Sequence, residues 1–179
     1  MARVRVHPPL IVDELTIREF RMDDVQALDD AIVRNLPYLR PWLGPWINAE
    51  PIGIERRQEL MQSWVDSYAS GGDHAIGIFI NDQLVGGTGL HDRNAPADVE
   101  IGYWVDEGFQ GRGIATRVTR ALTDFALQHE EVERVLIIHA ANNDKSRRIP
   151  ERLGFVEIPS VGECGGAPGV TWAMTRRHD

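Results

Sequence analysis

Residues 99–116 read VEIGYWVDEGFQGRGIAT, and this stretch decides the fold. The alternating segment 99–105 predicts a β-strand, the glycine-rich run 110–115 predicts a loop, and the apolar periodicity after it predicts a helix. The first N–H groups of a helix have no partner within the helix, and the helix dipole adds partial positive charge there. Gly111 and Gly113 remove side chains that would hold an anion away from the backbone. The stretch therefore predicts a phosphate-binding loop.

Three interpretations of this loop compete. A P-loop needs Gly-Lys-Ser/Thr at the helix start, and the only lysine of the chain, Lys145, lies far from the loop. A dinucleotide fingerprint would use Gly111, Gly113 and Thr116, but it normally opens a βαβ unit, whereas the strands before this loop have an antiparallel pattern. The third interpretation is a tight turn with no ligand. The surrounding motifs decide between them.

The rest of the pattern predicts an α/β fold in one domain over residues 1–179. Residues 1–12 are expected to form an irregular N-terminal extension. Pro37, Pro41 and Pro45 are expected to end the first helix early and leave a broken, aromatic segment. We expect strands at 14–20, 75–80, 84–91, 99–105, 134–139, 155–158 and 170–175, and helices at 25–33, 54–68, 114–129 and 146–153.

Composition narrows the function classes. A chain of 179 residues with 42% hydrophobic residues suits a soluble domain, and neither a membrane span nor a secretory signal is readable. The net charge of −8 argues against a nucleic-acid partner and is compatible with a cationic substrate. A single cysteine, Cys164, excludes an internal disulfide and fits the cytoplasm; it lies in an expected loop at 162–169, where we interpret it as a spectator. The 6 histidines are scattered without helical pairing, so no metal site is predicted.

The motifs around the loop occur in a distinctive order. They are LTIR at 15–18, LRPW at 39–42, EIGYWV at 100–105, GFQGRGIAT at 108–116, NNDKS at 142–146 and LGF at 153–155. This combination resembles the GNAT superfamily of acetyl-CoA-dependent N-acetyltransferases. Within it, the pattern is most similar to the RimJ/RimL group, which acetylates protein N-termini. The resemblance covers the chain from about residue 13 to the C-terminus.

The resemblance implies a mixed, mostly antiparallel sheet of six to seven strands with helices on both faces. Its central strands, 99–105 and 134–139, would start side by side and splay apart. The co-substrate would be acetyl-CoA, with the pantetheine arm hydrogen-bonded to strand backbone in the gap and the pyrophosphate on the loop. Arg112 either contacts phosphate or is a solvated loop arginine. The expected cofactor-binding residues are Tyr103, Trp104, Val105, Gln110, Gly111, Arg112, Gly113, Ile114, Ala115, Thr116, Asn143 and Ser146.

Acetyl transfer to an amine needs a base for the amine proton and a proton source for the leaving thiolate. Glu100, on the strand that ends at the gap, is the predicted base, directly or through a water; a solvent-facing or ion-paired glutamate is the alternative. Asn143 is predicted to cap the next helix, and the resemblance implies that it contacts pantetheine. Many GNAT enzymes have a tyrosine acid seven residues after this asparagine, where this chain has Pro150. The resemblance leaves the Ser146 hydroxyl, near the sulfur, as the substitute.

Acceptor specificity is the part that the sequence describes least. Tyr38, Trp42, Trp46 and Trp64 are the candidate substrate-binding residues, with core packing as the alternative. The first-choice acceptor is a protein N-terminal amine. A small-molecule amine, such as an antibiotic, an amino-acid derivative or a polyamine, is the second choice, and a CoA-binding sensor without activity is the third. A homodimer is the candidate assembly, and neither nucleic acid nor a membrane is an expected partner.

Overall fold

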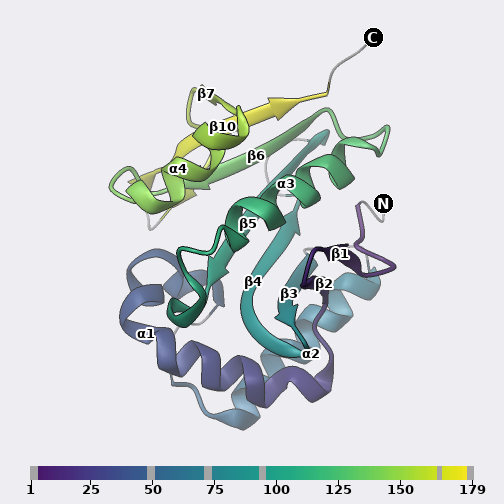
Figure 1. The fold of residues 1–179 in the computed structure, drawn as a ribbon, viewed down its shortest axis with the longest axis vertical. Coiled ribbons are helices and arrows are strands. Elements are labelled where there is room, and N and C mark those ends of the chain that lie inside the picture. Colours follow the sequence, from purple (N-terminus) through teal and green to yellow (C-terminus); the bar gives the residue numbers. More distant parts are fainter. Residues whose placement is uncertain (1–3, 48–50, 71–73, 93–95, 165–166, 177–179) are drawn as a thin grey trace.

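The computed structural model describes residues 4–47, 51–70, 74–92, 96–164 and 167–176. In this part of the chain, an 8-stranded sheet has the order β1-β2-β3-β4-β5-β6-β10-β7, and helices pack against it (Figure 1). The strands are β1 (Leu10–Val12), β2 (Leu15–Glu19), β3 (His74–Ile80), β4 (Gln83–His91), β5 (Asp98–Val105), β6 (Arg134–His139), β7 (Val156–Ile158), β8 (Glu163–Cys164), β9 (Ala167–Pro168) and β10 (Val170–Thr175). The helices are α1 (Val25–Ile47), α2 (Ile54–Ser70), α3 (Ile114–Leu127) and α4 (Asp144–Leu153), with short 3-10 helices η1 (Met22–Asp24) and η2 (Glu107–Phe109).

Most elements confirm the pattern-based expectations. All seven expected strands are present, and the three helices after residue 50 are present as well, with bounds that differ by at most two residues. The turn between β3 and β4 shows the local cause. Asn81 and Asp82 have φ values of 47° and 62°, and short polar side chains of this kind tolerate the left-handed region that a two-residue hairpin turn requires.

Helix α1 differs from the expectation, because it runs through all three prolines as far as Ile47. Each proline lacks the N–H that would bond to the carbonyl four residues earlier. Pro37, Pro41 and Pro45 are themselves spaced four apart, so the lost hydrogen bonds lie along one helix face. The described residues on that face are in contact with water: Pro37 and Pro41 are exposed, and Val33 is 43% exposed. Water can therefore bond the freed carbonyls, and the helix continues.

Two short additions also differ from the expectation. Residues 10–12 lie in the expected irregular extension but form β1, which pairs antiparallel with β2 and gives the sheet its eighth strand. The expected loop around Cys164 contains a separate two-stranded hairpin, in which β8 pairs with β9. Both elements have only two or three residues, too few to show an alternating pattern in the sequence.

Two hydrophobic cores lie on opposite faces of the sheet. One joins the strands to α3 through residues such as Val118 and Leu122, and the other joins them to α1 and α2 through residues such as Leu28 and Met61. Successive side chains of a strand point to opposite faces, so Val105 belongs to the first core and its neighbour Trp104 to the second. We call these faces the α3/α4 face and the α1/α2 face.

The central strands β5 and β6 are paired for only part of their length. They run parallel, and their register has three partners, from Asp98 with Arg134 to Glu100 with Leu136. Beyond Glu100, β5 continues to pair with β4 and β6 continues to pair with β10. The facing backbone of residues 101–105 and 137–139 therefore lies open along a gap. The expected splay of the central strands is confirmed.

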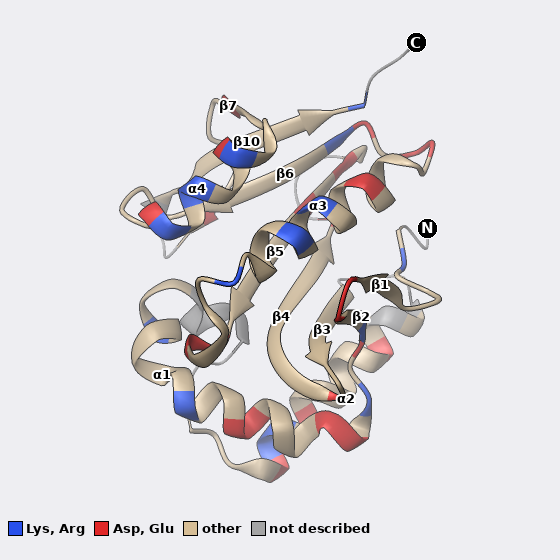
Figure 2. Cartoon of the chain, viewed as in Figure 1, with Lys and Arg blue, Asp and Glu red and all other residues tan. Residues whose placement is uncertain are grey.

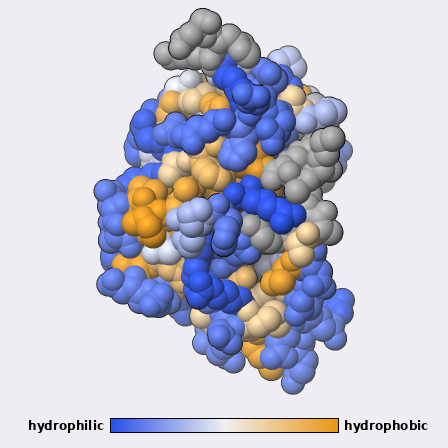
Figure 3. Space-filling model, turned by 90° about the vertical axis from the view of Figure 1, so that its right-hand side faces the viewer, coloured by the Kyte–Doolittle hydropathy of each residue, from blue (hydrophilic) through white to orange (hydrophobic). Residues whose placement is uncertain are grey.

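The exposed surface carries apolar groups in limited areas. On the face seen in Figure 3, hydrophobic residues form separate patches with hydrophilic residues between them. Ile11 on the edge strand β1 and Val156 on the opposite edge strand β7 are the most exposed large hydrophobic residues described, at 68% and 66%. Among the described helices, we find none with the length and apolar character needed to cross a bilayer.

Candidate active site

A cavity of about 770 Å³ lies where β5 and β6 separate. Residues of both cores line it: Ile101, Val105 and Ile114 from the α3/α4 face, and Leu28 and Trp104 from the α1/α2 face. The cavity is therefore reached from both sides of the sheet. A molecule threaded through it could be held on one face while its end is presented to a second molecule on the other.

The glycine-rich loop forms one wall of this cavity. Gly111 and Gly113 have φ values of +75° and +72°, which favour glycine, and no heavy atom other than those of the glycine and its adjacent residues lies within 4 Å of where a Cβ would stand. Gly113 is the N-cap of α3, so the first N–H groups of the helix point toward this open space. Both residues line the cavity together with Gln110, Ile114, Ala115 and Thr116, and cofactor binding by this set stays a prediction.

Arg112 has a different placement from its neighbours. Its guanidinium donates to the carbonyl of Gly108 at 3.2 Å and lies 4.9 Å from the centre of the Phe109 ring. Arg112 is not among the described residues that line the cavity. In this arrangement the side chain buttresses the turn before the loop.

A buried carboxylate fixes the turn that leads into the loop. Asp106 accepts hydrogen bonds from Arg34 at 2.5 Å, from the Asn35 amide at 2.9 Å and from the Gly108 N–H at 2.9 Å. Asn35 in turn accepts from the Glu107 N–H at 2.8 Å. Burial alone would raise the pKa of Asp106, but these donors outweigh it and lower that pKa. The cluster ties α1 to the start of the loop, and the sequence analysis did not identify it.

Helix α4 begins at the other wall of the gap. Asn143 is its N-cap, and the side-chain oxygen accepts from the Ser146 N–H at 3.1 Å, so the expected cap is confirmed. The Ser146 hydroxyl lies 3.1 Å from the Tyr103 hydroxyl, which also donates to the Ser146 carbonyl at 3.2 Å. Asn143, Ser146 and Tyr103 all line the cavity, and so do Trp104 and Val105.

Glu100 occupies the last paired position before β5 and β6 part. It lines the cavity and shares the α1/α2 face with Trp104, four residues along the strand. A second carboxylate, Glu163 of β8, lines the same cavity, and His91 is the cross-strand partner of Glu100 in β4. Sequence analysis missed Glu163 and His91, because they reach the site only through the β8–β9 hairpin and the β4–β5 register.

Cys164 has a thiol that is poorly activated, as expected of a spectator. Burial is the main cause that raises its pKa, and the negative charge of Glu100 raises it further.

His139 is buried beside the gap but is already occupied by hydrogen bonds. Its Nε2 accepts from the indole N–H of Trp172 at 3.0 Å, and its Nδ1 lies 2.9 Å from the carbonyl of Ala140. An indole N–H can only donate, so Nε2 carries no proton and Nδ1 carries one. The neutral ring has no lone pair left for a substrate proton. His139 is therefore a structural residue.

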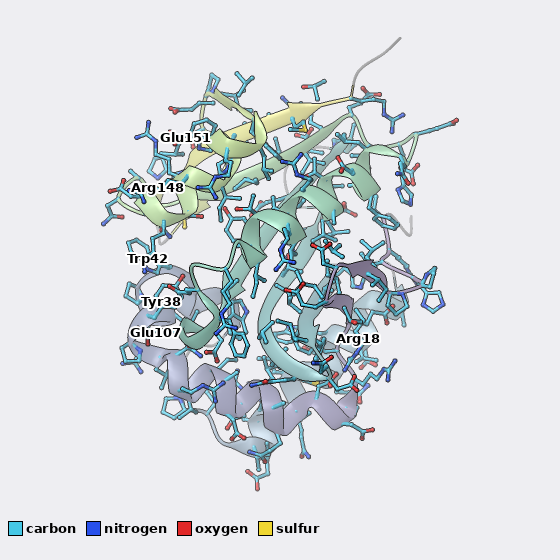
Figure 4. All side chains as sticks on the ribbon, viewed as in Figure 1. Arg18, Tyr38, Trp42, Glu107, Arg148 and Glu151 are labelled. Carbon is cyan, nitrogen blue, oxygen red and sulfur yellow. The ribbon has the colours of Figure 1, made fainter. Side chains whose placement is uncertain are left out.

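Aromatic residues gather at the end of the cavity on the α1/α2 face. Tyr38, Trp42 and Trp64 line it, and their role in binding the acceptor stays a prediction. Figure 4 shows Tyr38 and Trp42 of α1 on the same side of the molecule as Arg148 of α4. Trp64 also packs 5.8 Å from Phe20, ring centre to ring centre, so it has a role in the core as well. The side chain of Trp46 lies outside the described part of the chain.

Basic residues border the cavity on the α4 side. Figure 2 shows Lys and Arg residues along α4. Lys145, Arg148 and Arg152 of α4 line the cavity, and Lys145 donates to the Gln110 side chain at 3.2 Å. Within the described residues there is no cluster of three potential metal ligands. The site thus combines a phosphate-type loop, nearby cations and an exposed strand edge.

Comparison with known families identifies this architecture. The family model for the acetyltransferase (GNAT) domain matches residues 14–156. The chain belongs to the GNAT family of acetyltransferases. The acetyltransferase is 33% identical over 147 residues to the putative ribosomal N-acetyltransferase YdaF of Bacillus subtilis (strain 168), which covers 81% of this chain and 79% of the relative. It is 27% identical over 150 residues to the ribosomal-protein-serine acetyltransferase of Escherichia coli (strain K12), covering 82% and 81%.

Solved structures have the same fold. A probable acetyltransferase superposes on this acetyltransferase with a TM-score of 0.82 and 29% identity, over 94% of this chain and 97% of the other. RimL, a ribosomal L7/L12 α-N-protein acetyltransferase solved in complex with coenzyme A, superposes with a TM-score of 0.81 and 21% identity, over 93% and 96%. The similarity to the RimJ/RimL group that the motifs suggested is confirmed.

Proposed function

We propose that this acetyltransferase moves the acetyl group of acetyl-CoA directly to the N-terminal amine of a protein or peptide. The observation that carries the proposal is the similarity, over most of both chains, to relatives named as ribosomal N-acetyltransferases. The cavity supports it, because residues of the cores on both faces of the sheet line it, so a substrate on each face could meet the other there. Its α1/α2 end is lined by aromatic side chains and by two carboxylates, which suit a cationic amine attached to a larger molecule.

Acetyl-CoA would enter from the α3/α4 face. The backbone of residues 101–105, left unpaired by the splay, can hydrogen-bond to the amides of the pantetheine arm much as an added strand would. The N–H groups at Gly113 and the start of α3 would receive the pyrophosphate. Lys145, Arg148 and Arg152 supply positive charge beside the same path.

The acceptor would enter from the α1/α2 face. Glu100 is the proposed base, because it stands where the strands part and faces the acceptor side. It would take a proton from the ammonium, directly or through a water, and the free amine would attack the thioester carbonyl. Loss of the thiolate from the resulting tetrahedral intermediate forms the amide. Ser146 on the opposite face would donate a hydrogen bond to the departing sulfur.

The proposal can be tested with a panel of acceptors. Calorimetry measures acetyl-CoA binding, and a free-thiol assay measures transfer to serine-initiated peptides, to the same peptides with a formylated N-terminus, and to small amines. We expect turnover of the free peptides only, with the acetyl group placed on the α-amine by mass spectrometry. Turnover of small amines alone would instead indicate a small-molecule acceptor. Tight binding of acetyl-CoA without turnover of any acceptor would indicate a sensor.

A further inference from the structure

The Tyr103–Ser146 pair joins the two walls of the gap. Tyr103 belongs to β5 and Ser146 to the first turn of α4, and the tyrosine hydroxyl lies 3.1 Å from the serine Oγ and 3.2 Å from the serine carbonyl oxygen. A phenol has one proton to donate, so it can serve only one of these two acceptors at a time. The pair therefore has two hydrogen-bonding states.

The two states differ in where the serine proton points. When Tyr103 donates to the Ser146 carbonyl, its oxygen is free to accept from the Ser146 hydroxyl. When Tyr103 donates to Ser146 Oγ, the serine proton is released to point elsewhere. A hydroxyl that accepts one hydrogen bond is a better donor of the next, because hydrogen bonds in a chain polarise one another. The second state presents a strengthened donor in the gap.

We propose that Tyr103 is a positioning residue that turns the Ser146 hydroxyl toward the leaving sulfur of acetyl-CoA. This inference rests on the proposed function, which places that sulfur beside Ser146. The C–N bond forms and the C–S bond breaks, with the bonding pair leaving on sulfur. Glu100 passes the ammonium proton to solvent before the attack and takes the second amine proton as the C–N bond forms. The thiolate leaves hydrogen-bonded to Ser146 and takes its proton from water, so one proton is released overall. Tyr103 and Ser146 keep their own protons throughout.

The surroundings of the phenol fit this role. Burial raises the pKa of Tyr103 above its ordinary range, so the hydroxyl keeps its proton throughout the working pH range and is always a donor. Pro150, one turn further along α4, is buried and has no proton to give. Tyr103 packs with the core on the α3/α4 face, whereas Glu100 lies on the other face. Base and leaving-group support thus approach the thioester from opposite sides.

A double-mutant cycle tests the inference. Tyr103→Phe keeps the ring and removes only the hydroxyl, and we expect kcat to fall about tenfold, as for the loss of one good hydrogen bond. Ser146→Ala should lower kcat to a similar extent, and adding Tyr103→Phe to it should cost nothing more. In a Ser146→Thr background, which keeps a hydroxyl, Tyr103→Phe should again cost about tenfold. The acidic limb of the pH–rate profile and the affinity for acetyl-CoA should match the wild type in each case.

The cycle separates a positioning role from a structural one. Tyr103→Phe also removes the bond to the Ser146 carbonyl, so it should lower the melting temperature in both the wild-type and Ser146→Ala backgrounds, while of these two it lowers kcat only in the wild type. Losses in kcat that add across the cycle, or a wild-type kcat in Tyr103→Phe, would overturn the inference and leave the proposed function standing. If the wild-type chain acetylated no amine, both the inference on Tyr103 and the proposed function would be wrong.

Discussion

The two faces of the sheet meet in one cavity but are built in different ways. On the α3/α4 face, the groups that would hold acetyl-CoA are backbone N–H and C=O groups and a helix cap, set within the segments 101–116 and 143–146. On the α1/α2 face, the lining side chains Tyr38, Trp42 and Trp64 come from helices, far in sequence from Glu100. The comparison teaches that the cofactor half depends on local backbone geometry, whereas the acceptor half depends on tertiary packing. Changes on the two faces should therefore have separable effects.

The largest effect is expected from Gly113→Glu. A side chain at this position lies in the space where the pyrophosphate would approach, and glutamate adds like charge. We expect acetyl-CoA binding to fall below detection by calorimetry. Gly154→Glu is the matched control, since Gly154 also has a positive φ, of +84°, and open space around it, at the C-terminal end of α4. Both variants should lose a similar amount of thermal stability, but only the first should lose binding; normal binding by Gly113→Glu would contradict the assignment of the loop.

The next effect in size is expected from Glu100→Gln. The amide keeps the shape of the side chain but cannot accept a proton, so kcat should fall about 10²-fold or more, and the acidic limb of the pH–rate profile should disappear. Acetyl-CoA affinity should stay unchanged. Glu163→Gln and His91→Gln are the comparison variants, because both residues line the same end of the cavity. If either of them loses the acidic limb while Glu100→Gln keeps it, the role of base moves to that residue.

A smaller, one-sided effect is expected from Trp42→Ala. Removing an aromatic side chain from the acceptor end should raise the KM for the acceptor about tenfold, within the range found for aromatic residues at binding surfaces. The KM for acetyl-CoA should change little, because Trp42 belongs to α1, outside the segments 101–116 and 143–146 that would hold acetyl-CoA. Steady-state kinetics with each substrate varied in turn make the measurement. A matching rise in both KM values would show that the two faces are not separable.

The smallest effect on catalysis is expected from Asp106→Asn. Loss of the charge weakens the hydrogen bonds from Arg34, Asn35 and Gly108, which should cost about 1–3 kcal/mol of stability at neutral pH. The pKa of Asp106 is lowered in the folded state, so its contribution is complete above the unfolded pKa of about 4 and is lost as the pH falls through the folded value. Denaturant unfolding at a series of pH values should show wild type and variant converging in acid. A constant difference at every pH would contradict this account.

The same contrast explains how much the sequence predicted. The conformation of the glycine-rich turn, the cap at Asn143 and the splayed strands follow from short segments whose hydrogen bonding is local, and all three are confirmed, whereas phosphate binding by the loop stays a prediction. Hydrophobic periodicity also placed most strands and helices correctly, because one face of each is buried.

The missed features depend on distance in the fold. The hydrogen bond from the Asn35 amide to Asp106 joins residues 71 positions apart, and Glu163 reaches the cavity through a hairpin of two-residue strands. Helix α1 continues through its prolines because the proline-bearing face is exposed to water, and the local sequence pattern does not indicate which face is exposed. Such features require the positions of elements relative to one another.

The three-residue pairing of β5 with β6 also has a thermodynamic consequence. Residues 101–105 are paired with β4 on one side but present an unpaired strand edge on the side that faces β6, and an open strand edge is a template for unwanted association. A ligand bound along this edge occupies it only in the folded chain, so binding and folding are linked. At a free ligand concentration a hundredfold above Kd, the linkage adds about 2.7 kcal/mol to the free energy of unfolding. The resistance of the chain to unfolding and to aggregation should therefore rise and fall with the concentration of acetyl-CoA around it.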